Sequence, residues 1–185
     1  MDILRRGEVA GILCVIFLVA SIGASFVLGV GKSVTGDTVS LILYLAICVA
    51  YFVLILAVRH IAQSTGDAVF SSRMRDFYVA MVVICPLLAP LMAPLFITAS
   101  VERILSLVMI AAFAILGIVS IRVAPSFEKL EGSRALYGRK AGKWLRISGW
   151  LMATVILSIV GGFLSLFADY YLWRMIRQER LSGTN

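Results

Sequence analysis

The chain has 185 residues, of which 61% are hydrophobic and 15% charged; its mean hydropathy is +1.01 and its net charge is +7. Soluble domains have about 45–50% apolar and about 25% charged residues, so this composition excludes an ordinary soluble domain and predicts an all-α integral membrane protein. The basic excess does not indicate a nucleic-acid partner, because the basic residues lie between apolar runs, where membrane topology explains them.

The first predicted span covers residues 9–31, an apolar run long enough to cross a bilayer. A cleaved signal peptide is disfavoured, because the run is longer than a signal sequence needs and lacks a small-residue cleavage site. Ser21, Ser25 and Gly29 recur every four residues and form a small-residue face. Such a face lets another membrane helix approach closely, so these residues are predicted helix contacts.

The second predicted span covers residues 39–58 and carries Tyr44 and Tyr51 on one face. We expect these tyrosines to pack between helices, each hydroxyl finding a local partner or donating to another helix. Residues 59–76 are a predicted polar loop. They contain the only histidine, His60, which lacks the second histidine or clustered carboxylates that a catalytic or ligand role needs.

The third predicted span, residues 77–98, contains Pro86, Pro90 and Pro94 at a spacing of four, which places them on one face of a helix. Proline lacks an N–H, so the carbonyls of Val82, Pro86 and Pro90 would lose their helical partners. Two interpretations remain open. In the first, the prolines only kink the helix, and side chains of neighbouring helices donate hydrogen bonds to the free carbonyls. In the second, the free carbonyls form a binding site at membrane depth.

The fourth predicted span, residues 104–121, follows a cap at Ser100 and forms a hairpin with the third. Residues 122–146 are a basic cytoplasmic loop, in which Pro125 and the apolar residues after it predict a short amphipathic helix on the membrane surface. Basic residues at such a surface attract anionic lipid headgroups. The candidate headgroup contacts are Arg134, Arg139, Lys140, Lys143 and Arg146.

The fifth predicted span covers residues 147–169 and is followed by a short basic tail, 170–185. Trp150 and Tyr170 mark its ends, and the twenty residues between them correspond to about 30 Å of helix, the thickness of the hydrocarbon core. Gly161 and Gly162 give this span a face for close helix contact.

Five alternating spans with a cytoplasmic N-terminus place twelve Lys or Arg residues on the cytoplasmic side and five on the other. The positive-inside rule therefore favours N-in and C-out, in a bacterial inner membrane. The arginines of the tail do not agree with this topology. If the last segment turned back at Gly161-Gly162, the ratio would be fifteen to two, so a re-entrant fifth segment is an alternative.

No ionisable residue lies between the ends of the predicted spans, which disfavours proton-coupled pumps and charged-substrate carriers. Cys14, Cys48 and Cys85 each lie within an apolar run without metal-ligand spacing, so we expect buried free thiols. No catalytic residues, cofactor or metal site are predicted. An enzyme would need soluble-side residues such as His60, Asp67 and Glu128 to converge, which their spacing does not require.

The sequence thus predicts a five-helix membrane bundle in one domain, with a third helix kinked by three prolines. The favoured function is a non-catalytic accessory, assembly or scaffold component that binds other membrane proteins, or itself, through its small-residue faces. The alternative is a transporter or lipid-handling protein for a neutral or apolar solute, using the proline-broken third helix. The expected partners also include the lipid bilayer and its anionic lipids.

Overall fold

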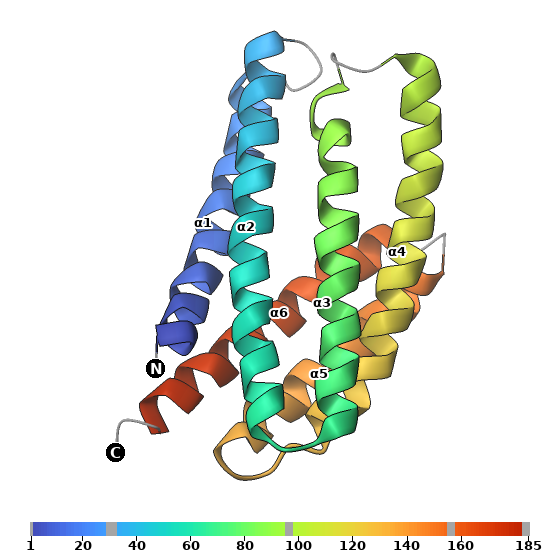
Figure 1. The fold of residues 1–185 in the computed structure, drawn as a ribbon. Helices are drawn as coiled ribbons and strands as arrows, with labels where there is room; N and C mark the ends of the chain where they lie inside the picture. The colour runs from blue at the N-terminus through green and yellow to red at the C-terminus, as the bar shows by residue number, and fades with distance from the viewer. Residues whose placement is uncertain (1, 29–32, 95–97, 155–157, 183–185) are drawn as a thin grey trace.

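The computed structural model describes residues 2–28, 33–94, 98–154 and 158–182, and all regular elements in these ranges are helical. Four helices run side by side as a bundle, here called the long helices, and a hairpin of two further helices lies against the end of the bundle that holds both chain termini (Figure 1). We call this the terminal end. The helices are α1 (Asp2–Leu28), α2 (Val34–Ser64), α3 (Ala68–Leu88), α4 (Ala99–Glu128), α5 (Ala135–Ala153) and α6 (Ser158–Ser182), with short 3₁₀ helices η1 (Ala89–Met92) and η3 (Gly132–Arg134).

The four long helices are each apolar enough to cross a membrane. The candidate spans are Ile3–Leu28, Val34–Ser64, Ala68–Leu91 and Ser100–Glu128. Each overlaps one of the first four predicted spans, which confirms an all-helical fold in the described residues and is compatible with a multi-pass membrane protein. Among the described residues there are four such helices, whereas the sequence predicted five.

Polar side chains fix where three of the long helices begin. Ser33 and Asp67 each accept backbone N–H groups from the first turns of α2 and α3. The cap of α4 is Thr98, whose hydroxyl accepts the N–H of Val101, and not Ser100 as predicted. These caps satisfy N–H groups that have no partner within the helix.

The polar segments between the spans are mostly helical, which corrects the predicted loop at 59–76. Only residues 65–67 connect α2 to α3, and the rest of that segment extends the two helices. A helix that projects beyond the bilayer keeps its backbone hydrogen bonds whatever the polarity of its side chains. Polarity therefore marked the membrane boundary and not the end of either helix.

The surface helix predicted within residues 122–146 is not a separate element, because α4 and α5 take up most of that segment. Phe127 and Leu130, expected on its membrane face, are buried in the bundle instead. The ring of Phe127 meets that of Phe70 edge to face, with 5.0 Å between the centroids. These apolar side chains are removed from water by α3 rather than by lipid.

The predicted fifth span, 147–169, is divided between two helices. The α5 helix ends at Ala153, Thr154 has extended backbone angles (φ −90°, ψ 119°), and α6 begins at Ser158. The two helices pack against each other as a hairpin along the terminal half of α4 (Figure 1).

Glycines allow this hairpin to pack closely. A Cβ added to Gly117 of α4 would lie 2.6 Å from the carbonyl oxygen of Gly149 in α5, and one added to Gly161 of α6 would lie 2.6 Å from the backbone nitrogen of Met152. A carbon atom cannot lie so close to a backbone atom to which it is not bonded, so neither position has room for a side chain. The helices α4, α5 and α6 therefore meet through bare backbone at this level.

The two ends of the described chain lie together. The Arg180 Nε is 2.8 Å from the Glu8 carboxylate, and the Trp173 indole N–H donates to the Glu8 carbonyl at 3.1 Å. The predicted N-in and C-out arrangement and its re-entrant alternative both stay predictions. The helix boundary in this segment follows Ala153 and does not lie at Gly161-Gly162.

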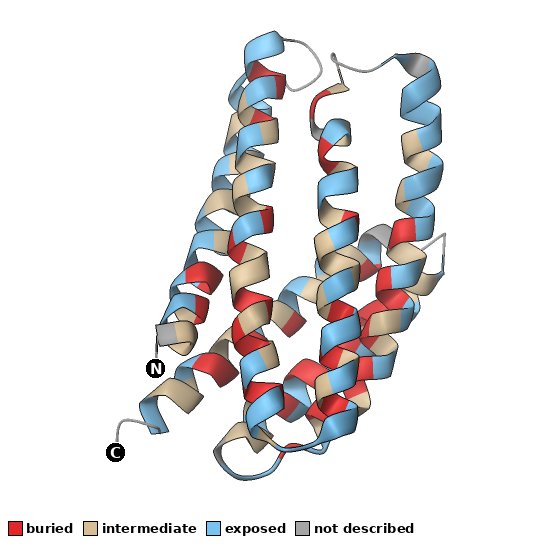
Figure 2. Cartoon of the chain, viewed as in Figure 1, coloured by how far each residue is buried: buried red, intermediate tan, exposed pale blue. Residues whose placement is uncertain are grey.

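The buried core lies in the terminal half of the bundle (Figure 2). There the α5–α6 hairpin packs against α4, α1 and α2, whereas the distal half consists of the four long helices alone (Figure 1). The largest buried core side chains include Leu54, Ile55, Val58, Ile61, Phe70, Met74, Val123, Phe127, Leu172, Met175 and Ile176. Packing of the hairpin therefore creates most of the core.

Candidate functional site

The proline stripe marks the end of α3. Pro86 lies inside the helix, and the backbone then tightens into η1, so that the Ala89 N–H bonds to the Pro86 carbonyl. The Ala93 N–H bonds to the Pro90 carbonyl at 3.1 Å. Two of the three carbonyls predicted to lose their partners therefore have backbone partners, because the chain changes from α-helical to 3₁₀ geometry at this point.

The hydrogen bond that this change removes is regained from α2. Because the Ala89 N–H bonds three residues back instead of four, the Cys85 carbonyl loses its α-helical donor. The Tyr44 hydroxyl donates to that carbonyl at 2.9 Å. Of the two roles left open for the Tyr44 hydroxyl, it has the alternative one, donation to another helix. A ligand site at Val82, Pro86, Pro90 and Pro94 stays a prediction.

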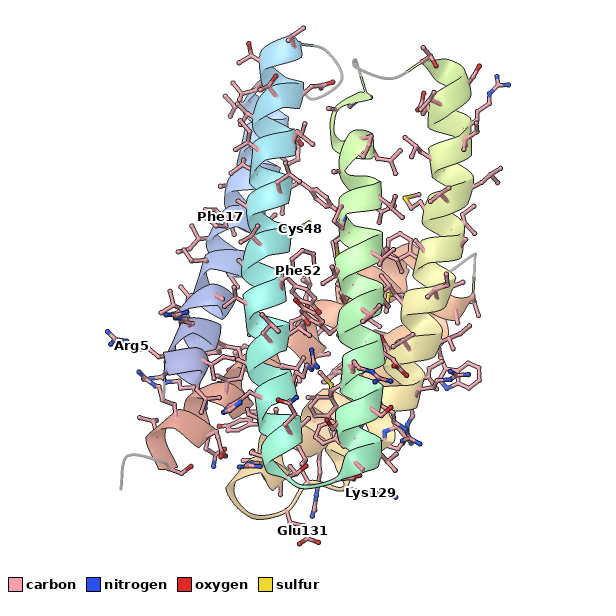
Figure 3. The ribbon with its side chains drawn as sticks, viewed as in Figure 1. Arg5, Phe17, Cys48, Phe52, Lys129 and Glu131 are labelled. Carbon is pink, nitrogen blue, oxygen red and sulfur yellow. The ribbon has the colours of Figure 1, made fainter. Side chains whose placement is uncertain are left out.

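Thiols surround this break. Cys14, Cys48 and Cys85 come from three different helices and are all unoxidised. The Cys48 side chain lies between α2 and α3 (Figure 3), within hydrogen-bonding reach of the Cys85 thiol and of Tyr44. The expectation of free thiols agrees with the structure, but only Cys48 is buried, whereas Cys14 and Cys85 are half-buried.

A carboxyl group lies in the interior that the sequence predicted to contain no charge. Tyr51 of α2 donates its hydroxyl hydrogen to Asp169 of α6 at 2.8 Å. Tyr51 is seven residues, or about 10 Å of helix, from Val58 at the end of the second predicted span, so the pair lies at membrane depth. An ionisable side chain at that depth needs a polar partner, and Tyr51 provides one.

The sequence missed this pair because Asp169 is the last residue of the predicted fifth span. One signal could have found it. Ala168, Leu172, Met175 and Ile176 form a helical stripe that continues past the supposed membrane boundary, and all four are buried. Asp169 is next to that stripe and so had to approach the bundle.

Charged side chains hold the hairpin to α1. Glu8 has only 12% of its side chain exposed and faces two arginines of α6, with Arg180 Nε at 2.8 Å and Arg177 Nε at 3.6 Å. The two arginines more than neutralise its charge. The N-terminal helix is therefore attached to the last helix by a partly buried, charge-balanced contact.

Two further ion pairs connect α5 and its flanking turn to neighbouring helices. Arg134 Nε donates to Glu179 of α6 at 2.7 Å, and Arg146 pairs with Glu128 of α4 at 2.6 Å. The hydrogen bonds to Glu179 raise the pKa of the Arg134 guanidinium, which keeps this group charged. A two-pronged arginine–carboxylate pair also fixes the direction in which the chain enters α5.

Of the five residues predicted to contact lipid headgroups, three have a side-chain partner within the chain and two face outward. Arg134 and Arg146 are engaged in the ion pairs described above. Lys140 Nζ lies 5.5 Å from the centre of the Tyr171 ring, a cation–π contact. Arg139 and Lys143 are exposed and are the members of the set that face outward without such a contact among the described residues.

The predicted helix contacts also divide. Gly161 is used within the chain, against α5, and the nearest side-chain atom to a Cβ added at Gly162 would be 3.9 Å away in Phe113. On α1, Ser25 is exposed and its hydroxyl bonds to the Ser21 carbonyl at 2.8 Å. Gly29 lies outside the described residues. The small-residue face of α1 is therefore left open by the rest of the described chain.

The chemistry that these residues support is limited. Among the described residues, no group of three or more His, Cys, Asp or Glu side chains is placed to hold a metal ion. His60, Asp67 and Glu128 lie at the terminal end, and Glu128 is engaged by Arg146.

No protein family, curated protein or solved structure matches this chain.

Proposed function

We propose that this chain is a non-catalytic membrane protein that associates, as an accessory or scaffold component, with other membrane proteins or with copies of itself. The observation that supports this best is the open small-residue face of α1. Membrane helices associate where small side chains let their backbones approach, and Ser21 and Ser25 form such a face on the outside of the bundle.

The surroundings of this face support the same proposal. Only 6% of the apolar window of α1 is buried within the chain, so most of the helix is available to lipid or to another helix. The Ser25 hydroxyl donates to a carbonyl of its own helix, so Ser25 can pack against an apolar partner without an unpaired hydroxyl.

The use of the proline break as a solute site has less support. Tyr44 occupies the Cys85 carbonyl, and backbone groups occupy those of Pro86 and Pro90. A solute that accepts or donates hydrogen bonds there would have to displace these partners.

Replacing Ser25 with leucine should reduce association, because the longer side chain prevents close approach at the small-residue face. The measurement is the yield of crosslinked species and of co-purifying chains after extraction in a mild detergent. Ala20→Leu is the matched control: it adds similar bulk at an exposed position on the opposite side of α1. Equal recovery from both variants, or a wild-type protein that is a monomer without partners, would contradict the proposal.

The proposal includes a topology in which both termini face the cytoplasm of a bacterial cell and the α5–α6 hairpin enters the membrane without crossing it. Of the 17 lysine and arginine residues, all but Lys32 and Arg103 then lie on the cytoplasmic side. Such a bias is what the positive-inside rule requires. The contact between Glu8 and Arg180 supports the placement of both ends on one side.

A reporter that fluoresces only in the cytoplasm should therefore be bright when fused after Asn185. The same reporter inserted between Lys32 and Ser33 should stay dark, and a periplasmic enzyme reporter should give the reverse result. A dark C-terminal fusion that is expressed at full length would restore the five-span topology.

A further inference from the structure

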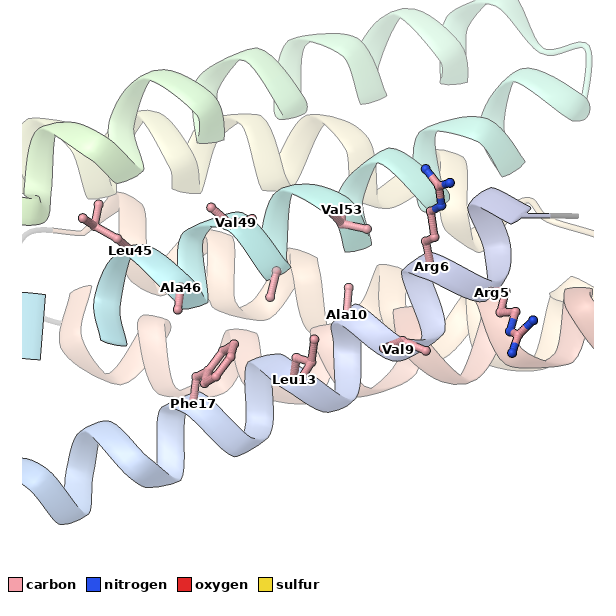
Figure 4. Close-up of a pocket in the computed structure, with 11 residues that line it drawn as sticks. Arg5, Arg6, Val9, Ala10, Leu13, Phe17, Leu45, Ala46, Val49 and Val53 are labelled. Atoms are coloured by element: carbon pink, nitrogen blue, oxygen red, sulfur yellow. The ribbon is translucent and has the colours of Figure 1, made fainter. Parts of the chain in front are cut away.

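An apolar groove of about 800 Å³ runs along the outside of the bundle between α1 and α2 (Figure 4). Its volume is within the range of about 300–1,000 Å³ that is typical of ligand sites. The wall on one side includes Val9, Leu13 and Phe17 of α1, and on the other Leu45 and Val49 of α2.

The groove exists because the two helices touch at one level and leave space at the next. Near the terminal end, a Cβ added to Gly7 would collide with the side chain of Ala57, so the helices are in close contact there. Farther along, Ala10, Ala46 and Ala50 lie between the helices and are too short to fill the space. Ala10 and Ala50 are buried beneath the larger wall residues and form the floor.

Two positive charges mark one end of this groove. Arg5 and Arg6 both line it there, and both are exposed (Figure 4). Within the described part of the chain neither takes part in an ion pair, since the adjacent carboxylate, Glu8, is engaged by Arg177 and Arg180. The charges at the mouth of the groove are therefore available to an external anion.

The positions of charge and apolar surface match an amphiphile. The apolar part begins at Val9 and continues for eight residues to Phe17, which is about 12 Å along the helix. The arginines lie beyond its terminal end, where the membrane surface is. We infer that the groove binds one anionic glycerophospholipid, with the phosphate at Arg5 and Arg6 and one acyl chain along the alanine floor.

Charge complementarity favours a lipid over a helix from another protein. Guanidinium groups bind phosphate oxygens through paired hydrogen bonds, and basic residues at a membrane surface attract anionic lipids. A partner helix seated on the alanine floor would cover the apolar walls but would leave the two arginines without an anion. This site is also separate from the small-residue face of α1, so it can be tested independently of the proposed association.

The test is native mass spectrometry of the purified chain in detergent with added phosphatidylglycerol or phosphatidylcholine. We expect one phosphatidylglycerol to remain bound at concentrations where phosphatidylcholine does not. The R5Q/R6Q variant should bind phosphatidylglycerol about 30-fold more weakly, which is what two surface contacts of about 1 kcal/mol each would contribute. The matched control is R122Q/K129Q, which removes the same charge from exposed positions outside the groove that are not among the predicted headgroup contacts.

Several outcomes would overturn the inference: equal loss in both double variants, equal binding of the two lipids by the wild-type chain, or a crosslink that places another protein chain at Ala46.

A second variant tests the acyl-chain contact without changing charge. Ala46→Phe fills the groove from its wall and should weaken phosphatidylglycerol binding at least fivefold. Unchanged binding by this variant, with an unchanged elution volume and helical circular dichroism, would place the lipid elsewhere.

Discussion

Replacing Gly117 with alanine should separate the α5–α6 hairpin from α4 and lower the free energy of unfolding by about 2–3 kcal/mol. The added methyl group would lie 2.6 Å from backbone atoms of both Gly149 and Ala153, and backbone cannot rotate away as a side chain can. This cost exceeds the roughly 1 kcal/mol by which alanine favours a helix over glycine. All three tryptophans belong to α5 and α6, so their fluorescence during unfolding in mixed micelles reports on this hairpin directly.

Gly23→Ala is the matched control for this experiment. It makes the same change in another long helix at a position with no atom within 4 Å of the new methyl group. The control should leave stability unchanged or raise it by up to about 1 kcal/mol. If both variants behaved alike, the close contact of α4, α5 and α6 through their glycines would be wrong.

Tyr51→Phe should lower the free energy of unfolding by about 1–2 kcal/mol, because it removes the hydroxyl that donates to Asp169 at membrane depth. The cost arises mainly from the carboxyl group that is left without this donor. Tyr170→Phe is a suitable control, since Tyr170 is 50% exposed. Its stability should remain within about 0.5 kcal/mol of the wild type.

A double-mutant cycle isolates the contribution of the pair. When Asp169→Leu is combined with Tyr51→Phe, both polar groups are removed, and the double variant should be more stable than Tyr51→Phe alone. Strictly additive effects of the two substitutions would show that the hydroxyl and the carboxyl do not depend on each other. In that case α2 and α6 would be held together by apolar packing only.

The four long helices were predictable because long apolar runs in a membrane protein have few alternatives. With no water in the bilayer core, every backbone polar group must be satisfied within the segment, and a helix does this for any apolar sequence. The boundaries were less predictable. At 59–76 and 122–146 the polar side chains show where the membrane ends, while helical backbone hydrogen bonds continue beyond it.

The hairpin was not predictable from aromatic spacing. Trp150 and Tyr170 are twenty residues apart and fit one crossing, but they belong to different helices, and both are at least half exposed. What decides between one span and two helices is whether the segment can pack on itself. Gly161 permits this, since a Cβ added there would lie 2.6 Å from the backbone nitrogen of Met152, and such a contact does not appear in a hydropathy profile.

The candidate functional residues were missed for the same reason. Arg5 and Arg6 could not be singled out, since nothing in the sequence shows that alanines of two helices form a groove beside them. Asp169 was placed at a boundary, and its partner Tyr51 is 118 residues away in the chain. Both features arise from distant segments brought together by the bundle, whereas the predicted motifs were all local.

The hairpin occupies only the terminal half of the bundle, so the cross-section of the protein differs between the two leaflets of a bilayer. In the topology proposed above, one leaflet would surround parts of all six described helices and the other would surround four. A body that is wider in one leaflet takes more lateral area there, and a membrane that is convex on that side provides that area. In that topology the described part of the chain has the shape of a wedge, best accommodated where the bilayer bends outward toward the two termini (Figure 1).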